Sequence, residues 1–188
     1  MHQDSWAIKA QQEGHRSRAV YKLMEIDKKF SLIQKDDIIL DIGAAPGGWS
    51  EYISIKYPNI QIFALDILPI DPIQNVTFFQ QDLRDINDNK TLTSFKGSFS
   101  LVISDLAPNI SGISLVDESN VLELNLLTLE IADSYLSDSM SRFIIKTFQN
   151  SNMKFFRSKM EKIFSLVQTC KPAASKKTSA EIYLYGER

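Results

Sequence analysis

Several predicted strands in this 188-residue chain end in a charged side chain, and such positions can carry chemistry. Four apolar runs lead directly into Asp41, Asp66, Asp105 and Lys146. In open α/β sheets, ligands bind outside the carboxyl ends of the strands. Each charge could instead mark a strand leaving the core for solvent. Because four of them recur at strand ends, we expect them to line one cleft.

A turn rich in small residues follows the first of these strands. Residues 41–49 read DIGAAPGGW, and glycines such as Gly43 and Gly47 let the backbone approach a ligand closely. Their spacing matches neither the dinucleotide-binding GxGxxG motif nor the P-loop. Asp66 ends the second strand, where an acid is suited to the two hydroxyls of a ribose. The pattern predicts a nucleoside-cofactor site that need not hold a pyrophosphate, with an empty tight turn as the alternative.

Polar residues also follow the third and fourth strands. Asp82 could accept a hydrogen bond from an adenine amino group, or it could be a surface acid. Asp105 begins DLAPN, and Pro108 keeps the chain extended as it leaves the sheet. A motif of this shape also occurs in amino methyltransferases, where it grips a nitrogen nucleophile. Lys146 is the residue that distinguishes a nitrogen nucleophile from a ribose hydroxyl as the nucleophile.

Lys146 would place an ammonium in a partly buried cleft, where it could take or steer the proton of a ribose hydroxyl. The alternative is a lysine that extends from its strand end into solvent. Glu181 begins the last predicted strand, and because that strand is expected to be antiparallel, its start lies at the same edge. We therefore expect Lys22, Asp105, Lys146 and Glu181 to converge.

The elements that would position these residues alternate along the chain. Short aliphatic runs predict strands at 38–42, 61–65, 76–80, 99–104, 142–146, 165–169 and 181–185. Amphipathic stretches predict helices at 4–13, 17–30, 49–56, 89–94, 118–136 and 152–163. Apolar strands separated by helices predict an α/β fold with a doubly wound, mostly parallel sheet. The short connection 172–180 requires a hairpin, so we expect one antiparallel strand at the end of the sheet.

The composition is that of a globular protein, with 44% hydrophobic and 23% charged residues. The single cysteine excludes an internal disulfide and a Cys-based zinc site and suggests a reducing compartment. His2 and His15 have no third ligand in view, so we expect no metal. The N-terminus does not read as a signal peptide, and no apolar run is long enough to cross a bilayer. We expect a cytoplasmic protein without membrane contact.

The net charge of −2 is unevenly distributed. Residues 1–35 carry +3, residues 36–146 carry −10 and residues 147–188 carry +5. The basic ends could form one positive face if they meet, or they could be solvated helix faces. We expect a single domain over 1–188, with a basic helical segment at 1–35 and the catalytic sheet and helices at 36–188. No exposed apolar stripe demands a partner, so we expect a monomer.

Six stretches in order resemble the FtsJ/RrmJ-like, S-adenosylmethionine-dependent ribose 2′-O-methyltransferases, most closely the bacterial enzymes for large-subunit ribosomal RNA. They read SRAVYKL (17–23), DIGAAPGGWS (41–50), DILPIDP (66–72), SDLAPNISG (104–112), IKTFQ (145–149), and KPAAS (171–175) running into SAEIY (179–183). Any one stretch is moderately specific, whereas six in the family's order cover nearly the whole chain.

The resemblance implies a fold, a cofactor and a set of site residues. The fold would be the Rossmann-like class I methyltransferase sheet with one antiparallel terminal strand. The catalytic residues would be Lys22, Asp105, Lys146 and Glu181, with Lys146 as the base for the 2′-hydroxyl. The contacts to S-adenosylmethionine would come from Gly47, Trp49, Asp66, Asp82 and Asp105. The reaction would need no metal.

The resemblance also implies the substrate, a uridine in the A-loop of the large ribosomal subunit. The RNA would lie across basic side chains, namely Arg16, Arg18, Lys22, Lys171, Lys176 and Lys177. Because the chain is acidic overall, we expect recognition to depend on the assembled subunit rather than on free RNA. One alternative is a tRNA ribose 2′-O-methyltransferase. Another is a catalytically silent RNA-binding or ribosome-assembly module, which the loss of a tetrad residue would favour. The glycine spacing argues against a nicotinamide dehydrogenase.

Overall fold

A seven-stranded sheet forms the centre of the computed structural model, which describes residues 5–109, 111–176 and 178–188. The strand order is β3-β2-β1-β4-β5-β7-β6. The strands are β1 Ile38–Ile42, β2 Gln61–Asp66, β3 Val76–Gln80, β4 Leu101–Ser104, β5 Arg142–Phe148, β6 Leu166–Cys170 and β7 Glu181–Glu187. Each predicted strand is therefore present, with small shifts of its ends.

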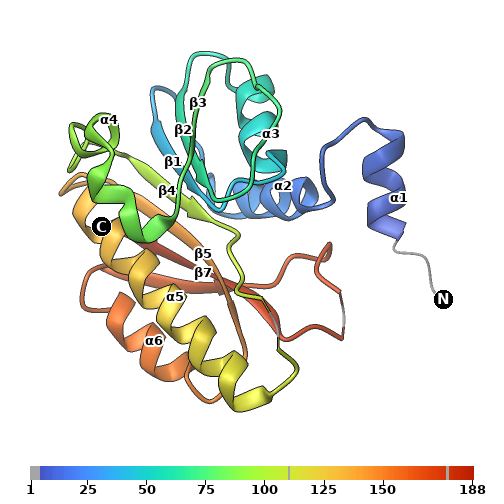
Figure 1. The fold of residues 1–188 in the computed structure, drawn as a ribbon, viewed down its shortest axis with the longest axis vertical. Coiled ribbons are helices and arrows are strands. Elements are labelled where there is room, and N and C mark those ends of the chain that lie inside the picture. The colour runs from blue at the N-terminus through green and yellow to red at the C-terminus, as the bar shows by residue number, and fades with distance from the viewer. Residues whose placement is uncertain (1–4, 110, 177) are drawn as a thin grey trace.

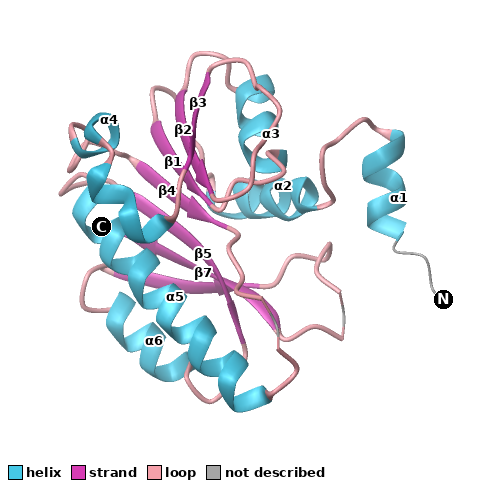
Figure 2. Ribbon diagram, viewed as in Figure 1, coloured by secondary structure: helices cyan, strands magenta, loops and turns pink. Residues whose placement is uncertain are grey.

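Helices cover both faces of the sheet (Figures 1 and 2). The helices are α1 Ser5–Gln12, α2 Ala19–Phe30, α3 Gly48–Lys56, α4 Lys90–Thr93, α5 Ser114–Tyr135 and α6 Met153–Met160, with a 3-10 helix η1 at Leu83–Asp88. Buried side chains of α2 and α3, such as Leu23 and Ile53, join one hydrophobic cluster. Those of α5 and α6, such as Leu129 and Phe156, join another. The doubly wound, mostly parallel α/β fold is confirmed.

Strand β7 runs antiparallel to both of its neighbours, β5 and β6. The expected hairpin between the last two strands is present, but β7 is inserted between β5 and β6 and is not the outermost strand. The burial of the two strands explains this order. The five central residues of β7 are buried, whereas three of the five residues of β6 are exposed. The more apolar strand occupies the interior position, where both of its edges are paired.

Two helix boundaries differ from the sequence prediction by three residues or more. Helix α5 begins at Ser114 rather than 118, because the carboxylate of Asp117 accepts the backbone N–H groups of Ser111 and Gly112 and folds the preceding turn. Helix α6 ends at Met160 rather than 163. The first predicted helix is confirmed at Ser5–Gln12, and Asp4 lies outside the described residues. Within the described ranges, no helix is both long and apolar enough to span a membrane.

Candidate active site

The four predicted tetrad residues form two ion pairs at the carboxyl edge of the sheet. Lys146 Nζ, on β5, lies 3.1 Å from Asp105 Oδ1, just beyond β4, and it also donates to the backbone oxygen of Asp105. Lys22 Nζ, on α2, lies 2.7 Å from Glu181 Oε1 at the start of β7. The structure therefore brings these side chains together from four separate elements, as the strand-end pattern predicted.

Both lysines are largely buried, with side-chain exposures of 6% for Lys22 and 10% for Lys146. A buried ammonium is strongly unfavourable unless a carboxylate and hydrogen bonds compensate for the lost hydration. Each lysine here has such a carboxylate, and Lys146 has a backbone oxygen as well. The alternative of a lysine extending freely into solvent is therefore excluded for Lys146.

Tyr183 connects the two ion pairs and was not identified from the sequence. Its hydroxyl donates to Asp105 Oδ1 at 2.6 Å, and Lys22 Nζ lies 5.8 Å from its ring centroid. Burial, reinforced by the charge of Asp105, raises the pKa of Tyr183 well above its ordinary value, so the phenol stays a donor. A signal was present in the sequence. Tyr183 lies two positions after Glu181, which places both on the same face of a strand.

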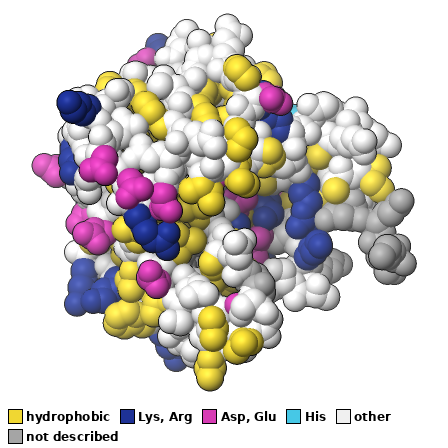
Figure 3. Space-filling model, in the orientation of Figure 1, with side chains coloured by type: hydrophobic (Ala, Val, Ile, Leu, Met, Phe, Trp, Pro, Cys, Tyr) yellow, Lys and Arg dark blue, Asp and Glu magenta, His cyan; other side chains and the backbone are white. Residues whose placement is uncertain are grey.

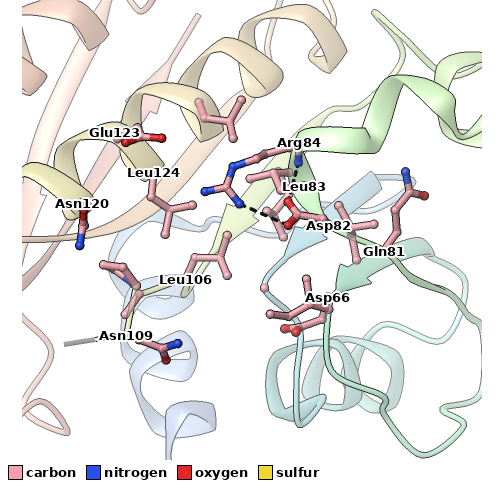
Figure 4. Close-up of a pocket in the computed structure, with 17 residues that line it drawn as sticks. Asp66, Gln81, Asp82, Leu83, Arg84, Leu106, Asn109, Asn120, Glu123 and Leu124 are labelled. Atoms are coloured by element: carbon pink, nitrogen blue, oxygen red, sulfur yellow. Dashed lines mark hydrogen bonds and ion pairs between the residues drawn. The ribbon is translucent and has the colours of Figure 1, made fainter. Parts of the chain in front are cut away.

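A cavity of about 450 Å³ opens beside this cluster, at the carboxyl ends of β1, β2 and β4 (Figure 4). Figure 4 shows Asp66 and Asp82 on one side and Asn120 and Glu123 of α5 on the other. The apolar part of its wall comes from Ile42, Leu65, Leu83, Leu106 and Leu124. An apolar cavity with a few directed carboxylates suits a purine nucleoside.

The two acids of this cavity are held by backbone donors. Asp66 accepts the N–H groups of Ala45 and Leu68, each at 2.8 Å. Asp82 precedes η1, accepts the N–H of Arg84 at 2.8 Å, and forms an ion pair with its guanidinium at 3.2 Å. A carboxylate has about four lone-pair sites, so each keeps acceptor capacity for a ligand hydroxyl or amino group.

A second cavity, of about 250 Å³, shares Gly43 with the first. Its polar lining consists of Ser17, Arg18, Lys22, Asp41 and Asp105. Ser17 Oγ is buried and makes no hydrogen bond, and a Cβ added at Gly48 would lie 2.6 Å from it. Buried polar atoms without partners are uncommon, so this orphan hydroxyl suits a polar ligand. Together, the two cavities fit a ligand with a nucleoside at one end and a charged group at the other.

Gly47 caps the start of α3, and Trp49 is the second residue of that helix. Gly47 has a φ of +100°, and a Cβ there would lie 2.9 Å from Ile73 Cδ1. Trp49 lines the smaller cavity, and its indole N–H donates to the backbone oxygen of Ala19 at 2.8 Å. Trp49 therefore borders the region where a cofactor is expected and ties it to α2, whereas Gly47 lines neither of these two cavities and shapes the turn before α3.

Asp41 is a buried carboxyl group at the same edge, 1% exposed. Burial raises its pKa to about 7; the hydroxyl of Ser50, which donates at 2.6 Å, partly opposes this effect. The charges of Asp105 and Asp66 raise the pKa further. Because a pKa of about 7 leaves Asp41 partly protonated at neutral pH, a cationic ligand would favour its ionised form.

Residues 15–188 match the protein family described as FtsJ-like methyltransferase. The chain belongs to this family. It is 38% identical to ribosomal RNA large subunit methyltransferase E of Azoarcus sp. over 97% of this chain and 90% of that protein. It is 39% identical to the protein of the same name from Neisseria meningitidis, over 98% and 90%.

The FtsJ-like fold is supported by a solved relative. A crystal structure of a ribosomal RNA methyltransferase from Plasmodium falciparum superimposes with a TM-score of 0.83. The two share 30% identity, over 93% of this chain and 98% of that one. The Rossmann-like methyltransferase architecture expected from the sequence is thus confirmed for this FtsJ-like chain.

Arg16, one of the basic residues expected to face RNA, makes contacts within the protein in this FtsJ-like structure. Arg16 lies 2.9 Å from Glu51 and donates to the backbone oxygens of Asp71 and Pro72 at 2.8 and 3.0 Å. Its guanidinium is therefore directed at the protein, where it joins the N-terminal segment to α3 and to the loop after β2. Lys177 lies outside the described residues. Figure 3 shows Lys and Arg side chains gathered in a hollow to the right of centre.

The described part of the FtsJ-like chain contains no cluster of three or more His, Cys, Asp or Glu side chains that could hold a metal ion. His15 lies 3.6 Å from Glu13 and packs edge-on against Tyr21. His2 lies outside the described ranges. His15 therefore takes part in a local contact of the N-terminal segment.

Proposed function

We propose that this chain transfers a methyl group from S-adenosylmethionine to a ribose 2′-hydroxyl of large-subunit ribosomal RNA. The observation that carries the proposal is the buried Lys146–Asp105 ion pair, which stands beside a cavity suited to a nucleoside. The names of the FtsJ-like relatives, which refer to the large ribosomal subunit, support the substrate class.

The proposed roles of the cavity residues follow from their positions. Asp66 would accept the ribose hydroxyls of the donor, and Asp82 its adenine amino group. Gly47 and Trp49 would shape the turn against which the amino-acid end lies, and Asp105 would contact the donor from the smaller cavity. The unpartnered Ser17 hydroxyl and the carboxyl group of Asp41 support a ligand whose end is both polar and cationic.

When bound, S-adenosylmethionine supplies a methyl group that its sulfonium charge already activates, and we propose no metal ion. The chain then has to orient the ribose and remove one proton. We assign to Lys146 Nζ, in its neutral amine form, the uptake of the 2′-hydroxyl proton, which converts it to the ammonium paired with Asp105. Asp105 holds that nitrogen through its carboxylate and backbone oxygens. Lys22, fixed by Glu181, would place a second positive charge where the alkoxide develops.

We further propose the finer substrate that the resemblance implies, a uridine in the A-loop of the assembled subunit. The acidic pI of about 5.7 supports weak binding to free RNA and recognition within the particle. The single sheet through the chain supports one domain over 1–188, comprising the 1–35 and 36–188 parts. We propose that it acts as a monomer in the cytoplasm.

The proposal is tested by methyl transfer from labelled S-adenosylmethionine to large ribosomal subunits from a strain lacking this chain. Nuclease digestion and mass spectrometry locate the label, with naked transcript and tRNA as parallel substrates. We expect one 2′-O-methyluridine in the subunit, and slower labelling of the transcript. Labelling of tRNA alone would replace the substrate with the tRNA alternative. If no RNA is labelled although the protein binds S-adenosylmethionine, the alternative of a catalytically silent RNA-binding module would be favoured.

A further inference from the structure

The loop between β6 and β7 is tied to α2 by an acidic residue outside the predicted site. The carboxylate of Glu25 accepts the backbone N–H groups of Ala173 and Ala174, at 2.7 and 3.1 Å. One carboxylate therefore satisfies two consecutive N–H donors of the turn. Bonds from neutral donors to an ionised acceptor are stronger than those between neutral groups, so this contact fixes the position of the turn.

The same turn reaches the tetrad through its next residue. Ser175 is 4% exposed, and its hydroxyl donates to Glu181 Oε1 at 2.7 Å. Glu181 in turn holds Lys22 through both carboxylate oxygens, at 2.7 and 2.9 Å. Glu181 thus receives one donor from the turn and one from α2.

These contacts form a closed ring that begins and ends on one helix. Lys22 and Glu25 are three residues apart on α2, so they lie on neighbouring positions of the same helix face. From Lys22, the ring passes through Glu181, Ser175 and the two alanine N–H groups back to Glu25. Ala174 is fully buried and packs in a hydrophobic cluster with Val20 of α2, which adds an apolar contact between the turn and this helix.

We propose that Glu25 and Ser175 are positioning residues that hold the Lys22–Glu181 pair in place. This inference rests on the proposed function, since it assigns them to the same reaction. Lys22 and Glu181 have flexible side chains, and ordering such side chains costs conformational entropy. The ring supplies that order from outside the cavities, because neither Glu25 nor Ser175 lines them.

The link can be measured without activity, by the rate at which lysines of the full chain are acetylated. Mass spectrometry would compare wild type with Glu25→Gln and Ser175→Ala. Gln sets an amide N–H₂ against one of the two backbone N–H groups, and Ala removes the hydroxyl. We expect Lys22 to react several-fold faster in both variants, with Lys146 unchanged. Exposed Glu130, on α5, gives the matched control Glu130→Gln.

Steady-state kinetics test whether the contacts of Glu25 and Ser175 contribute to methyl transfer. We expect kcat for methyl transfer to fall about tenfold in Glu25→Gln and Ser175→Ala, because small displacements of catalytic groups carry large rate penalties. Thermal unfolding shows that the variants fold; donor affinity is not the control, because Lys22 lines the smaller cavity. Ser175→Thr keeps a hydroxyl and should restore most of kcat.

The outcomes separate the inference from the proposed function. If Lys22 reactivity and kcat in both variants equal those of Glu130→Gln, the positioning role is overturned. If Lys22 becomes reactive but kcat is unchanged, the ring orders the pair without serving catalysis, which also overturns the role. A wild-type chain that methylates no RNA refutes the proposed function and with it the catalytic role, while faster labelling of Lys22 would still establish the structural link.

Discussion

Lys146 of β5 and Tyr183 of β7 are direct partners in the antiparallel register, and both contact the same carboxylate oxygen of Asp105, Lys146 as an ion pair and Tyr183 as a hydrogen-bond donor. Lys146 Nζ lies 3.1 Å from Asp105 Oδ1, and the Tyr183 hydroxyl lies 2.6 Å from it. Directly opposed side chains share one face of a sheet, so the pairing of β5 with β7 delivers both side chains together. The carboxylate is thereby fixed between two strands.

Replacing Tyr183 by Phe removes the hydroxyl that donates to Asp105 and leaves the aromatic ring of the side chain in place. We expect Asp105 to lose part of its orientation and kcat to fall about tenfold. Single-turnover methyl transfer measures this change. Tyr185→Phe is the control, because Tyr185 is on the same strand and donates to Glu187 instead. Equal rates for the two variants would refute a role for the Tyr183 hydroxyl.

Asp41→Asn tests the buried carboxyl group through the pH dependence of stability. The folded-state pKa of Asp41 is about 7, above its ordinary value of 3.8, so unfolding releases a proton between these pH values. Asp41 therefore lowers the free energy of unfolding as pH rises through this window, by at most about 1.4 kcal/mol per pH unit. In urea unfolding, the stability of the Asp41→Asn variant relative to wild type should rise from about pH 4 to pH 7 and then level off. A difference independent of pH would contradict the raised pKa.

Gly43→Ala tests the junction of the two cavities. Gly43 has a φ of +79°, and a Cβ there would lie 2.3 Å from Leu106 Cδ2. We expect Leu106 to be displaced and the affinity for S-adenosylmethionine, measured by calorimetry, to fall. Gly97→Ala carries a similar backbone strain of about 1 kcal/mol but has no neighbour within 4 Å. Equal donor affinities in the two variants would exclude this steric mechanism.

The Arg16→Gln variant distinguishes two roles of Arg16, a structural contact with the loop after β2 and a contact with RNA phosphate. Arg16 holds the loop after β2, whose Ile73 packs over Gly47. We expect weaker donor binding and an unchanged salt dependence of RNA binding. A lost phosphate contact would instead lower the slope of log K against log salt by about 0.9. Titrations at several salt concentrations measure that slope. A reduced slope in the variant would show that Arg16 contacts RNA phosphate.

The strands and the edge that carries the site could be predicted from the sequence, because apolar runs and terminal charges are local signals. The convergence of Lys146 with Asp105 follows from parallel strands ending at one edge. Glu181 follows from the antiparallel direction of the last strand. Lys22 required the resemblance, since α2 has no fixed place in such a pattern. Their catalytic roles stay predictions.

The remaining features depend on packing between distant segments. The position of β7 between β5 and β6 was set by which strand buries more apolar surface, and both orders satisfy a hairpin. Arg16 was expected at RNA because a charge count does not show which carbonyl oxygens a guanidinium meets. The Glu25 ring joins residues separated by 148 positions, and no local pattern reports it.

The proposed role of Lys146 in methyl transfer is tested by the 2′-O-methyl content of large ribosomal subunits after incubation with the Lys146→Ala variant. Lys154→Ala is the matched control, because Lys154 is an exposed lysine on α6. We predict that Lys154→Ala methylates one ribose as wild type does, whereas Lys146→Ala binds S-adenosylmethionine but transfers no methyl group. If the Lys146→Ala variant transferred methyl groups as fast as wild type, the proposed role of Lys146 would be wrong.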